Sequence, residues 1–371
     1  MRILLICPKS SVFLSFRKNL ILRLNELGHK VIGIGFDNEY EEKIKKLNVE
    51  FHYFKDANRS LNPFKILTLK KRYAKIIKKI NPDLVFTFML KPNIYGVQGA
   101  KLAGCDNIYS MVEGAGDVFN NKGLKWGLIR KYVCHGYKKA FKHSKKVFFL
   151  NQTDLNEFVD RGLVKREQCE TVLGIGVDLE HFSAKPIKNY DSFLMIARLL
   201  KTKGVFEYCQ AAKIVKQKYP NAKFKLLGVP YGVSVKDLKE YLDNGIVEYL
   251  GVTNDVRPYI EEASVHVLPT YYREGLVVVN METSSMGRAI ITCDNTGTRE
   301  TVKDGYSGFL VKTKDAEAIA EKMIYFLENP SKVEEMGKNA RKYAEECFDQ
   351  KIINDKICKI IGADDLNGKI L

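Results

Sequence analysis

The sequence predicts an α/β protein made of two Rossmann-like domains in tandem. Short apolar runs alternate with segments of helical periodicity along the chain, a pattern typical of parallel, doubly wound sheets. The alternation stops once, at the polar residues 185–192, and then starts again. The 371 residues, 45% of them hydrophobic, suffice for two domains with a core in each.

The elements follow in strand-to-helix order. The first series opens with a strand, a helix that Gly28 is placed to end, and a second strand. The predicted strands are 2–7, 31–36, 83–88, 107–112 and 145–150, then 193–198, 222–228, 247–251, 263–269 and 288–294. The predicted helices are 16–27, 64–80, 93–103 and 124–143, then 204–218, 234–243, 255–262, 276–286 and 315–328.

The linker sets the expected domain boundaries. We expect domains over residues 1–185 and 190–345, with a C-terminal helix at 346–365 that completes the first domain. In open α/β sheets, ligands bind beyond the carboxyl ends of the strands. Two such domains that face each other would place the site in the cleft between them.

Composition excludes several classes of protein. No apolar run approaches the ~20 residues that span a bilayer, and the polar residues that follow position 7 come too soon for a signal peptide. We therefore expect a cytoplasmic location. The eight cysteines have no CxxC spacing, which argues against zinc and against a disulfide framework, and we expect no cofactor.

The net charge of +16 is concentrated in the first half of the chain. Residues 1–180 hold 32 Lys and Arg against 18 Asp and Glu, whereas residues 181–371 hold 28 against 26. Such a field attracts nucleic acid, anionic lipid or a phosphorylated substrate. No nucleic-acid-binding module with stacking aromatics is recognisable, so we expect no nucleic-acid partner.

Two glutamates, Glu274 and Glu282, flank a change from strand-like to helix-like pattern. If a helix starts at about Leu276, Glu274 lies in the loop before it and Glu282 lies two turns along it. The amides of Gly275 and Leu276 would then point out of the helix N-terminus, which attracts phosphate oxygens. Alternatively, the pattern is a helix N-cap followed by an exposed glutamate.

Two cations, Arg198 and Lys203, follow the first predicted strand of the second domain. A guanidinium and an ammonium group at a strand end are suited to neutralising a diphosphate, both in binding and when it departs as a leaving group. Alternatively, they are two solvated cations in a lysine-rich loop.

The ordered set of motifs resembles family 4 of the GT-B glycosyltransferases over nearly the full length. The resemblance rests on the two pairs above and on three phrases: GIGVDLEHF at 174–182, YLGVTNDV at 249–256 and NTGTRETVKDGYSGFLV at 295–311. It implies a GT-B fold, a nucleotide-sugar donor and transfer with retention of anomeric configuration. It also implies an acceptor-binding first domain and a nucleotide-sugar-binding second domain.

The resemblance assigns roles to individual residues. It implies that Arg198 and Lys203 bind the diphosphate and that Glu274 lies near the donor-sugar hydroxyls. It also implies that the amides of Gly275 and Leu276 contact the phosphate or the sugar.

Further residues complete the implied donor site. Glu282 would bind the ribose, and Gly228, Leu250 and Gly251 would line the base pocket. Family members of this type need no metal, and the chain has no DxD-like motif in a suitable loop. Positive charge from the two cations would replace a divalent ion.

The first domain departs from the family pattern at two places. The usual His-Gly-x-Gly phrase is Glu-Gly-Ala-Gly here, so Glu113 replaces a histidine that approaches the donor sugar. Glu113 is a candidate ligand for a sugar or acceptor hydroxyl, or else a loop residue that caps the next helix. The first loop lacks the usual glycine pair, and we expect Arg17 to contact an acceptor phosphate instead.

These departures, together with ANRSLNPFK at 57–65, resemble most the bacterial enzymes that assemble glycans on polyprenyl diphosphate. That resemblance implies UDP-GalNAc as donor and a polyprenyl-diphosphate-linked sugar as acceptor. The alternatives are another UDP-sugar or GDP-sugar for lipopolysaccharide or capsule, or a nucleotide-sugar epimerase that needs no acceptor. A non-catalytic binding protein would be expected to lack Arg198, Lys203 or Glu282.

A lipid-linked acceptor would explain the basic first half through contact with an anionic membrane surface. The helix at 64–80 is amphipathic and lysine-rich, although its apolar face fits packing on a sheet. The segment 119–131 is the better candidate, because it carries the single tryptophan among cations: Trp126, Lys122, Lys125 and Arg130. We expect peripheral attachment to the inner face of the membrane.

The family mechanism requires no protein nucleophile. The departing diphosphate oxygen accepts the proton of the acceptor hydroxyl, so the protein supplies charge stabilisation and positioning. Double displacement would need a carboxylate beneath the anomeric carbon, and Glu113 stays open for that role.

Overall fold

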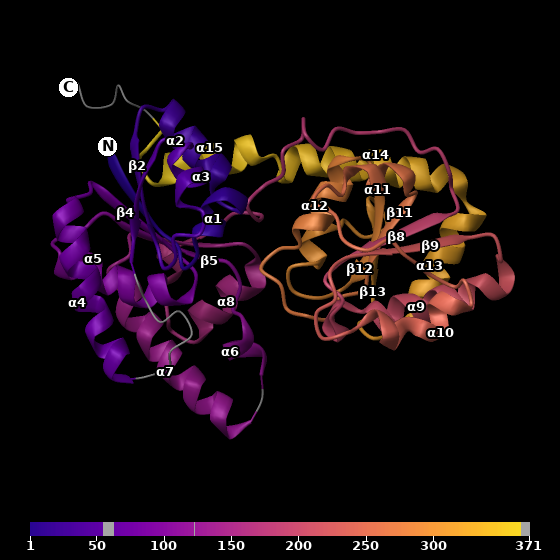
Figure 1. Ribbon diagram of the computed structural model, residues 1–371, viewed down its shortest axis with the longest axis horizontal. Helices are drawn as coiled ribbons and strands as arrows, with labels where there is room; N and C mark the ends of the chain where they lie inside the picture. Colours follow the sequence, from indigo (N-terminus) through magenta and orange to yellow (C-terminus); the bar gives the residue numbers. More distant parts are fainter. Residues whose placement is uncertain (55–62, 122, 365–371) are drawn as a thin grey trace. The chain divides into compact units, whose positions relative to one another are not determined.

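The computed structural model describes residues 1–54, 63–121 and 123–364. The chain divides into two compact units, which we call unit 1 (Met1–Ile175 and Lys351–Leu371) and unit 2 (Gly176–Gln350) (Figure 1). The division therefore falls before the polar linker. The chain enters and leaves unit 2 side by side, because Val177 and Phe348 share a backbone hydrogen bond of 2.7 Å.

Unit 1 contains a parallel sheet of order β3-β2-β1-β4-β5-β6-β7. The central strands β4 and β5 are buried at every residue, as expected for a parallel sheet covered on both faces. The strands are β1 (Arg2–Ile6), β2 (Lys30–Gly35), β3 (Val49–Tyr53), β4 (Leu84–Phe88), β5 (Ile108–Val112), β6 (Lys146–Phe149) and β7 (Cys169–Thr171).

The helices of unit 1 flank this sheet (Figure 1). They are α1 (Ser10–Ser15), α2 (Lys18–Glu26), α3 (Glu41–Lys45), α4 (Pro63–Ile80), α5 (Val97–Leu102), α6 (Asp117–Asn120), α7 (Leu124–Phe141), α8 (Gln152–Asp160) and α15 (Gln350–Ile360). The helix predicted at 16–27 is α2, and the short helix α1, which precedes it, lies in a segment that was expected to be a loop. The C-terminal helix α15 joins unit 1 through an ion pair between Arg23 and Asp355 at 2.6 Å.

Unit 2 contains a parallel sheet of order β10-β9-β8-β11-β12-β13. Its strands are β8 (Ser192–Ile196), β9 (Lys223–Leu227), β10 (Glu248–Tyr249), β11 (Val265–Leu268), β12 (Ala289–Cys293) and β13 (Gly308–Val311). Its helices are α9 (Val205–Lys218), α10 (Lys239–Asp243), α11 (Arg257–Glu262), α12 (Val278–Ser285), α13 (Ala316–Glu328) and α14 (Pro330–Cys347). Figure 1 shows α9, α10 and α13 on one side of the sheet and α11, α12 and α14 on the other.

Each sheet reverses its strand order once, between β1 and β4 in unit 1 and between β8 and β11 in unit 2. At such a switch point the loops that follow the two strands diverge to opposite faces and leave a ligand-binding crevice. The expectation of two Rossmann-like sheets is therefore confirmed. No helix in residues 1–54, 63–121 and 123–364 has the length and apolar content needed to span a bilayer.

Candidate functional site

The switch point of unit 2 brings together two of the predicted site residues. Lys203 ends the short helix η3 (Lys201–Lys203) after β8, and Glu274 lies in the loop after β11. Their side chains form an ion pair and are only 12% and 17% exposed. The pair therefore has little competition from water, and both groups lie where a parallel sheet binds its ligand.

Backbone contacts fix the Lys203 loop to the loop after β11. The carbonyl oxygen of Thr202 accepts hydrogen bonds from the amides of Tyr271, at 2.9 Å, and Tyr272, at 3.0 Å. Gly204 has a φ of 80° next to Pro269, and a Cβ atom there would overlap the carbonyl oxygen of Pro269. Glycine is thus required for this close approach.

The Glu274 loop is held on its other side by the 295–298 loop. The amide of Glu274 donates to the carbonyl oxygen of Thr296 at 3.2 Å, and that of Val277 donates to Gly297 at 3.0 Å. A Cβ atom at Gly297 would lie 2.6 Å from the carbonyl oxygen of Glu274. The phrase NTGTRETV, noted in the sequence, therefore contributes backbone support to Glu274.

The helix that follows Glu274 begins later than predicted. Helix α12 starts at Val278, and Val277 has extended backbone angles as its N-cap. Gly275 and Leu276 therefore lie in the loop, and the first helical amides are those of Val278 and Val279. The prediction that Gly275 and Leu276 open the helix is wrong, because Val277 is still extended, a conformation that its branched Cβ favours.

Glu282 lies on the second turn of α12 and is partly buried. Burial raises the pKa of its carboxyl group to about 7. No cation or hydrogen-bond donor among the described residues pairs with this carboxyl group. A carboxyl group kept in such a place without a partner is suited to receiving ligand hydroxyls.

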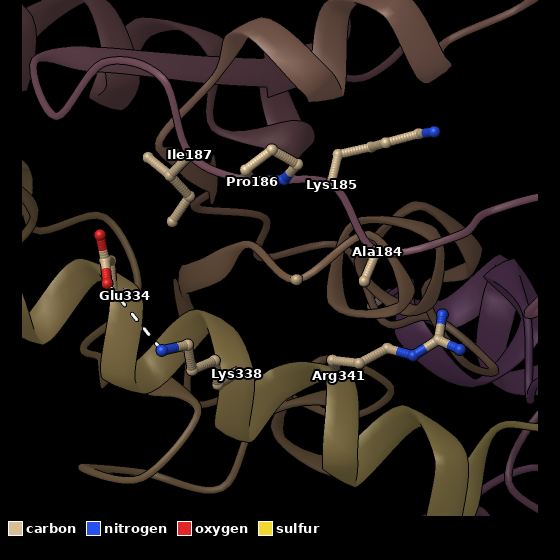
Figure 2. A pocket seen from close by; sticks show the side chains of 8 residues that line it. Ala184, Lys185, Pro186, Ile187, Glu334, Lys338 and Arg341 are labelled. Carbon is tan, nitrogen blue, oxygen red and sulfur yellow. Dashed lines mark ion pairs between the residues drawn. The ribbon is translucent and has the colours of Figure 1, made fainter.

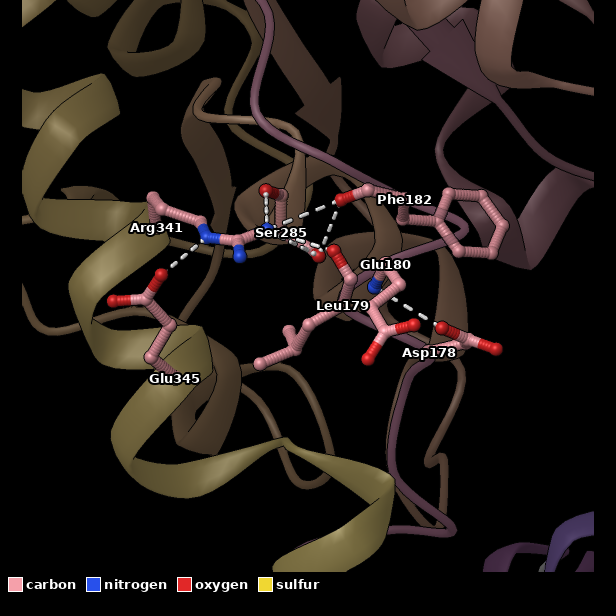
Figure 3. Close-up of polar contacts among 7 residues, drawn as sticks. All are labelled: Asp178, Leu179, Glu180, Phe182, Ser285, Arg341 and Glu345. Atoms are coloured by element: carbon pink, nitrogen blue, oxygen red, sulfur yellow. Dashed lines mark hydrogen bonds and ion pairs between the residues drawn. The ribbon is translucent and has the colours of Figure 1, made fainter.

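The C-terminal end of α12 is anchored by Arg341 of α14 (Figure 3). Arg341 Nη1 donates to the carbonyl oxygens of Ser285 at 2.8 Å and of Leu179 and Phe182 at 3.2 Å. Asp178 Oδ1 accepts the amide of Glu180 at 3.0 Å and so closes the turn before Phe182. The phrase at 174–182 thus acts as a support for the helix that carries Glu282.

The predicted base-pocket residues lie together at the ends of β8, β9 and β10. The amide of Gly228 donates to the carbonyl oxygen of Gly251 at 2.9 Å. A Cβ atom at Gly228 would overlap the carbonyl oxygen of Ala197 at the end of β8. Leu250 is partly buried beside them, and its amide donates to β9.

Arg198 is exposed and lies over the ring of Tyr231, 5.1 Å from its centroid. Among the described residues, no carboxylate pairs with this guanidinium, and it forms no hydrogen bond or ion pair with Lys203 or Glu274. Sequence reasoning missed Tyr231, since an aromatic residue in a polar loop carries no periodic signal.

In unit 1, two further predicted residues, Arg17 and Glu113, form an ion pair. The Arg17 side chain is only 2% exposed, and that of Glu113 is 13% exposed. This arrangement differs from the expectation that Arg17 meets an acceptor phosphate. The guanidinium lies beneath the surface and its charge is balanced by Glu113.

Helix α7 carries the predicted membrane segment. Trp126 is partly buried, whereas Lys125 is exposed; Lys122 lies outside the described residues. Arg130 is engaged locally, since its Nε donates to the carbonyl oxygen of Val118 at 2.9 Å. The exposed apolar residues of the helix lie at intervals of four and are Leu124, Leu128 and Tyr132, which we call the α7 stripe.

Unit 2 also contains a pocket of about 400 Å³ between α14 and residues 184–187 (Figure 2). Lys185, Lys338 and Arg341 are among its lining residues, and Lys338 pairs with Glu334 at 3.9 Å. None of the predicted site residues that the structure describes lines this pocket. In the part of the chain that the structure describes, no three His, Cys, Asp or Glu side chains gather as a metal-binding group.

Two family models match the chain. Residues 2–151 match the model described as glycosyl transferase 4-like, and residues 177–343 match glycosyl transferases group 1. Among solved structures, a glycosyltransferase from Rickettsia africae superposes with a TM-score of 0.77 at 20% identity, covering 99% of both chains. Anabaena HepE in complex with UDP and glucose gives a TM-score of 0.74 at 17% identity, over 98% of this chain and 99% of that one. These likenesses show the GT-B fold.

Curated relatives extend over most of the chain. The N,N'-diacetylbacillosaminyl-diphospho-undecaprenol alpha-1,3-N-acetylgalactosaminyltransferase of Campylobacter jejuni is 30% identical over 359 residues, which is 93% of this chain and 94% of that protein. The UDP-Gal:alpha-D-GlcNAc-diphosphoundecaprenol alpha-1,3-galactosyltransferase of Escherichia coli is 26% identical over 67% of each chain. With its two GT-B sheets and this full-length relative, the chain belongs to family 4 of the GT-B glycosyltransferases.

Proposed function

We propose that this glycosyltransferase moves GalNAc from UDP-GalNAc to a polyprenyl-diphosphate-linked sugar, with retention of configuration and without a metal ion. The observation that carries the proposal is the Lys203–Glu274 pair at the switch point of unit 2, in a chain whose full-length relative is named for this transfer. Unit 2 would take the nucleotide sugar and unit 1 the acceptor.

The donor half of the proposal rests on the groups of unit 2. Lys203 and Arg198 supply positive charge for the diphosphate, and Lys203 is held by the loop contacts described above. The carboxyl group of Glu282, which has no partner in the described part of the chain, is suited to the two ribose hydroxyls. When a diphosphate arrives, Lys203 gains a second anionic partner, and Glu274 becomes available to sugar hydroxyls.

The chemistry then needs no protein nucleophile. The bond from the anomeric carbon to the diphosphate oxygen breaks, and the acceptor hydroxyl bonds to the same face of that carbon. The hydroxyl proton passes to the departing diphosphate. Lys203 and Arg198 would stabilise the charge that develops on the diphosphate, the task that a divalent cation performs in other enzymes.

The acceptor half is supported by the name of the relative and by unit 1. The relative from C. jejuni acts on a sugar linked to undecaprenol by diphosphate. An enzyme with such a substrate has to work at a membrane, and the α7 stripe with Lys125 beside it is suited to an anionic surface. We propose peripheral attachment at the cytoplasmic face of the membrane through this stripe.

The test is donor turnover by the purified protein. UDP- and GDP-sugars would be supplied with and without a polyprenyl-diphosphate-linked amino sugar, in parallel samples with EDTA. We expect UDP release from UDP-GalNAc only when the acceptor is present, with no loss in EDTA, and an α-linked product by NMR. Loss of turnover in EDTA would contradict the proposal that no metal ion is needed. A β-linked product would contradict transfer with retention of configuration.

A second donor has support from one relative. The E. coli relative is named for transfer from UDP-Gal, so UDP-Gal is the alternative that the panel must include. A GDP-sugar would point to another acceptor pathway, such as lipopolysaccharide or capsule. Conversion of the donor to its epimer without an acceptor would identify a nucleotide-sugar epimerase instead.

A further inference from the structure

The pocket between α14 and residues 184–187 has no part in the proposed transfer (Figure 2). It lies within unit 2, and no described residue of the predicted donor site lines it. Its volume of about 400 Å³ is that of a small-molecule site, since ligand pockets in proteins measure about 300 to 1,000 Å³. The pocket is therefore large enough for a ligand of its own.

One wall of the pocket is a chain segment that the fold holds in place. The buried side chain of Arg288 donates from Nη1 to the carbonyl oxygen of Lys185 at 2.6 Å, and from Nη2 to that of Pro186 at 3.3 Å. The amide of Lys185 donates to the carbonyl oxygen of Met286 at 3.3 Å. Ile187 is partly buried and packs against the core of unit 2. The shape of this wall is therefore set before any ligand binds.

The opposite wall is α14, which approaches the turn after α12 closely. A Cβ atom at Gly337 would overlap the carbonyl oxygen of Gly287 and lie 3.5 Å from Ile187 Cδ1. Gly287 has a φ of 76°, which also favours glycine. Figure 2 shows the side chains of Ile187 and Ala184 directed toward α14. The middle of the pocket is therefore lined by apolar groups and by backbone.

The charged side chains lie toward the two ends of the pocket. Figure 2 shows Lys185 and Arg341 toward one end and the pair of Glu334 and Lys338 at the other. Among the described residues, Lys185 Nζ forms no hydrogen bond or ion pair. Arg341 Nη1 is used by the backbone at the end of α12, and Nε donates to Glu345 Oε1 at 2.6 Å. Arg341 Nη2 has no such partner in the described part of the chain, so the end with Lys185 offers two unused cationic donors.

The free atoms of these donors favour one kind of anion. A carboxylate binds arginine best through two parallel hydrogen bonds, and Arg341 has only Nη2 left for a ligand. A phosphate group presents oxygens in several directions, so it can accept from Nη2 and from the flexible ammonium group of Lys185 at once. Glu334 would repel an anion at the other end. The phosphate should therefore bind beside Lys185, with the rest of the ligand along the apolar middle.

We propose that this pocket binds a phosphate monoester with an apolar body. The phosphate group is held by Lys185 and Arg341, and the body lies between Ile187 and α14. Lys338 adds a weaker attraction, because Glu334 offsets its charge. The site shares no described residue with the predicted donor site, so it does not depend on the proposed transfer.

The test is a saturation-transfer NMR titration of the full chain with n-hexyl phosphate. Saturating UDP is present throughout, to keep the probe out of the predicted donor site. We expect a saturable signal from the hexyl protons. Inorganic phosphate should displace the probe only at concentrations about tenfold higher or more, because it lacks the apolar body. 1-Hexanol, which lacks the phosphate group, should give no saturable signal in the same concentration range.

Substitutions then locate the bound probe. Lys185→Gln should weaken binding about tenfold, and Lys338→Gln about twofold to threefold. Ala184→Phe should abolish binding, because its ring fills the middle of the pocket. The matched controls are Lys188→Gln in the same segment and Lys342→Gln on α14, two exposed lysines that do not line the pocket, and both should bind the probe as the wild type does.

Three results would overturn the inference. The first is the lack of a saturable signal in the wild type. The second is wild-type affinity in Lys185→Gln and Ala184→Phe, or an equal loss in Lys342→Gln, which would indicate diffuse attraction to a basic surface. The third is displacement by inorganic phosphate at equal concentration, which would show that the apolar middle contributes nothing. Melting temperatures check the folding of each variant, and if Ala184→Phe is destabilised, the exposed lysine variants still decide. None of these readouts requires sugar transfer, so failure of the proposed function would leave the test intact.

Discussion

Arg17 in unit 1 and Arg288 in unit 2 are both fully buried arginines, yet their partners differ in kind. Burial lowers the pKa of each to about 10. Arg288 donates only to backbone carbonyl oxygens, and these belong to Ile260, Glu261, Ala263, Lys185, Pro186 and Met286 at 2.6 to 3.3 Å. Arg17 contacts one carbonyl oxygen, one aromatic ring and one carboxylate, and its Nε has no hydrogen-bond partner among the described residues.

The difference shows that burial and pKa alone do not identify a functional cation. All nitrogen atoms of the Arg288 guanidinium are used to join α11, the start of β12 and residues 185–186, so none remains for a ligand. Arg17 holds Glu113, whose Oε2 has no hydrogen-bond partner among the described residues. The useful criterion is whether contacts within the fold already use every hydrogen-bond donor and acceptor of a buried charged group and its partner.

The largest expected effect follows from removing the guanidinium of Arg288, whose nitrogen atoms all donate to backbone carbonyl oxygens. Arg288→Met should lower the free energy of unfolding by about 4 kcal/mol, because several buried carbonyl oxygens lose their donor. Urea unfolding followed by circular dichroism measures this. The double variant Arg17→Met/Glu113→Gln leaves no buried charge unpaired. It should therefore lose less stability than Arg288→Met, and it should lose more transfer activity. Equal losses of stability in the two variants would break the distinction.

Lys203 should behave as a site cation. Lys203→Ala should lower kcat/KM for transfer by about 10² to 10³, since one positive group at the departing diphosphate is lost. Its melting temperature should stay near that of the wild type, because the neighbouring loops are held by backbone hydrogen bonds. The matched control is Lys225→Ala, which removes another partly buried Lys–Glu pair of unit 2, at 2.8 Å from Glu262, and should leave transfer intact.

The Glu282 carboxyl group has no partner among the described residues, and the effects of substituting it should depend on pH. Burial raises the pKa of this carboxyl group to about 7, so the folded state holds a proton that the unfolded state releases at its ordinary pKa of 4.5. Stability from this group is therefore fully present below the unfolded pKa and is lost as pH rises through about 7. Glu282→Gln should thus raise the melting temperature at pH 8 and leave it unchanged at pH 4.

Ligand binding should show the opposite dependence. If the ionised Glu282 accepts both ribose hydroxyls, affinity for a UDP-sugar should weaken by up to about tenfold per unit as pH falls below 7. Isothermal titration between pH 8 and pH 5.5 measures this, and the diphosphate diester of the ligand stays ionised throughout. Glu282→Gln should bind weakly at every pH. If the affinity of the wild type for a UDP-sugar does not change with pH, the proposal that Glu282 binds the ribose is wrong.

Much of the fold could be predicted because buried parallel strands are continuous apolar runs, as in β4 and β12. The edge strand β3 was missed because Glu50 and His52 interrupt its apolar residues, so it is not a continuous apolar run like the central strands. Helix α1 was missed because it is only six residues long, and its residues were interpreted as the loop after β1. Helix α14 was missed because Asn329–Pro330 ends the preceding helical pattern, although Pro330 is itself the first residue of α14.

The site was predictable only as separate residues. Glu274 and Lys203 were recognised from motifs, but their pairing depends on β8 and β11 being neighbours in the sheet, which local patterns do not record. The pairing of Arg17 with Glu113 likewise requires the order of β1, β4 and β5. A motif indicates which groups take part, and the strand order determines which of them meet.

The smallest expected effect concerns apolar groups, since the two leucines of the α7 stripe are the most exposed large apolar side chains among the described residues. Leu124 is 86% exposed and Leu128 is 66% exposed. Leu128→Asp should weaken binding to vesicles of anionic phospholipid about tenfold, because an inserting leucine is replaced by a charge that the surface repels. Sedimentation with the vesicles measures it, and Leu102→Asp, at a leucine 59% exposed elsewhere in unit 1, is the control. Equal binding of both variants would leave only the basic residues of unit 1 to hold the protein at a membrane, and that attraction would disappear at high salt.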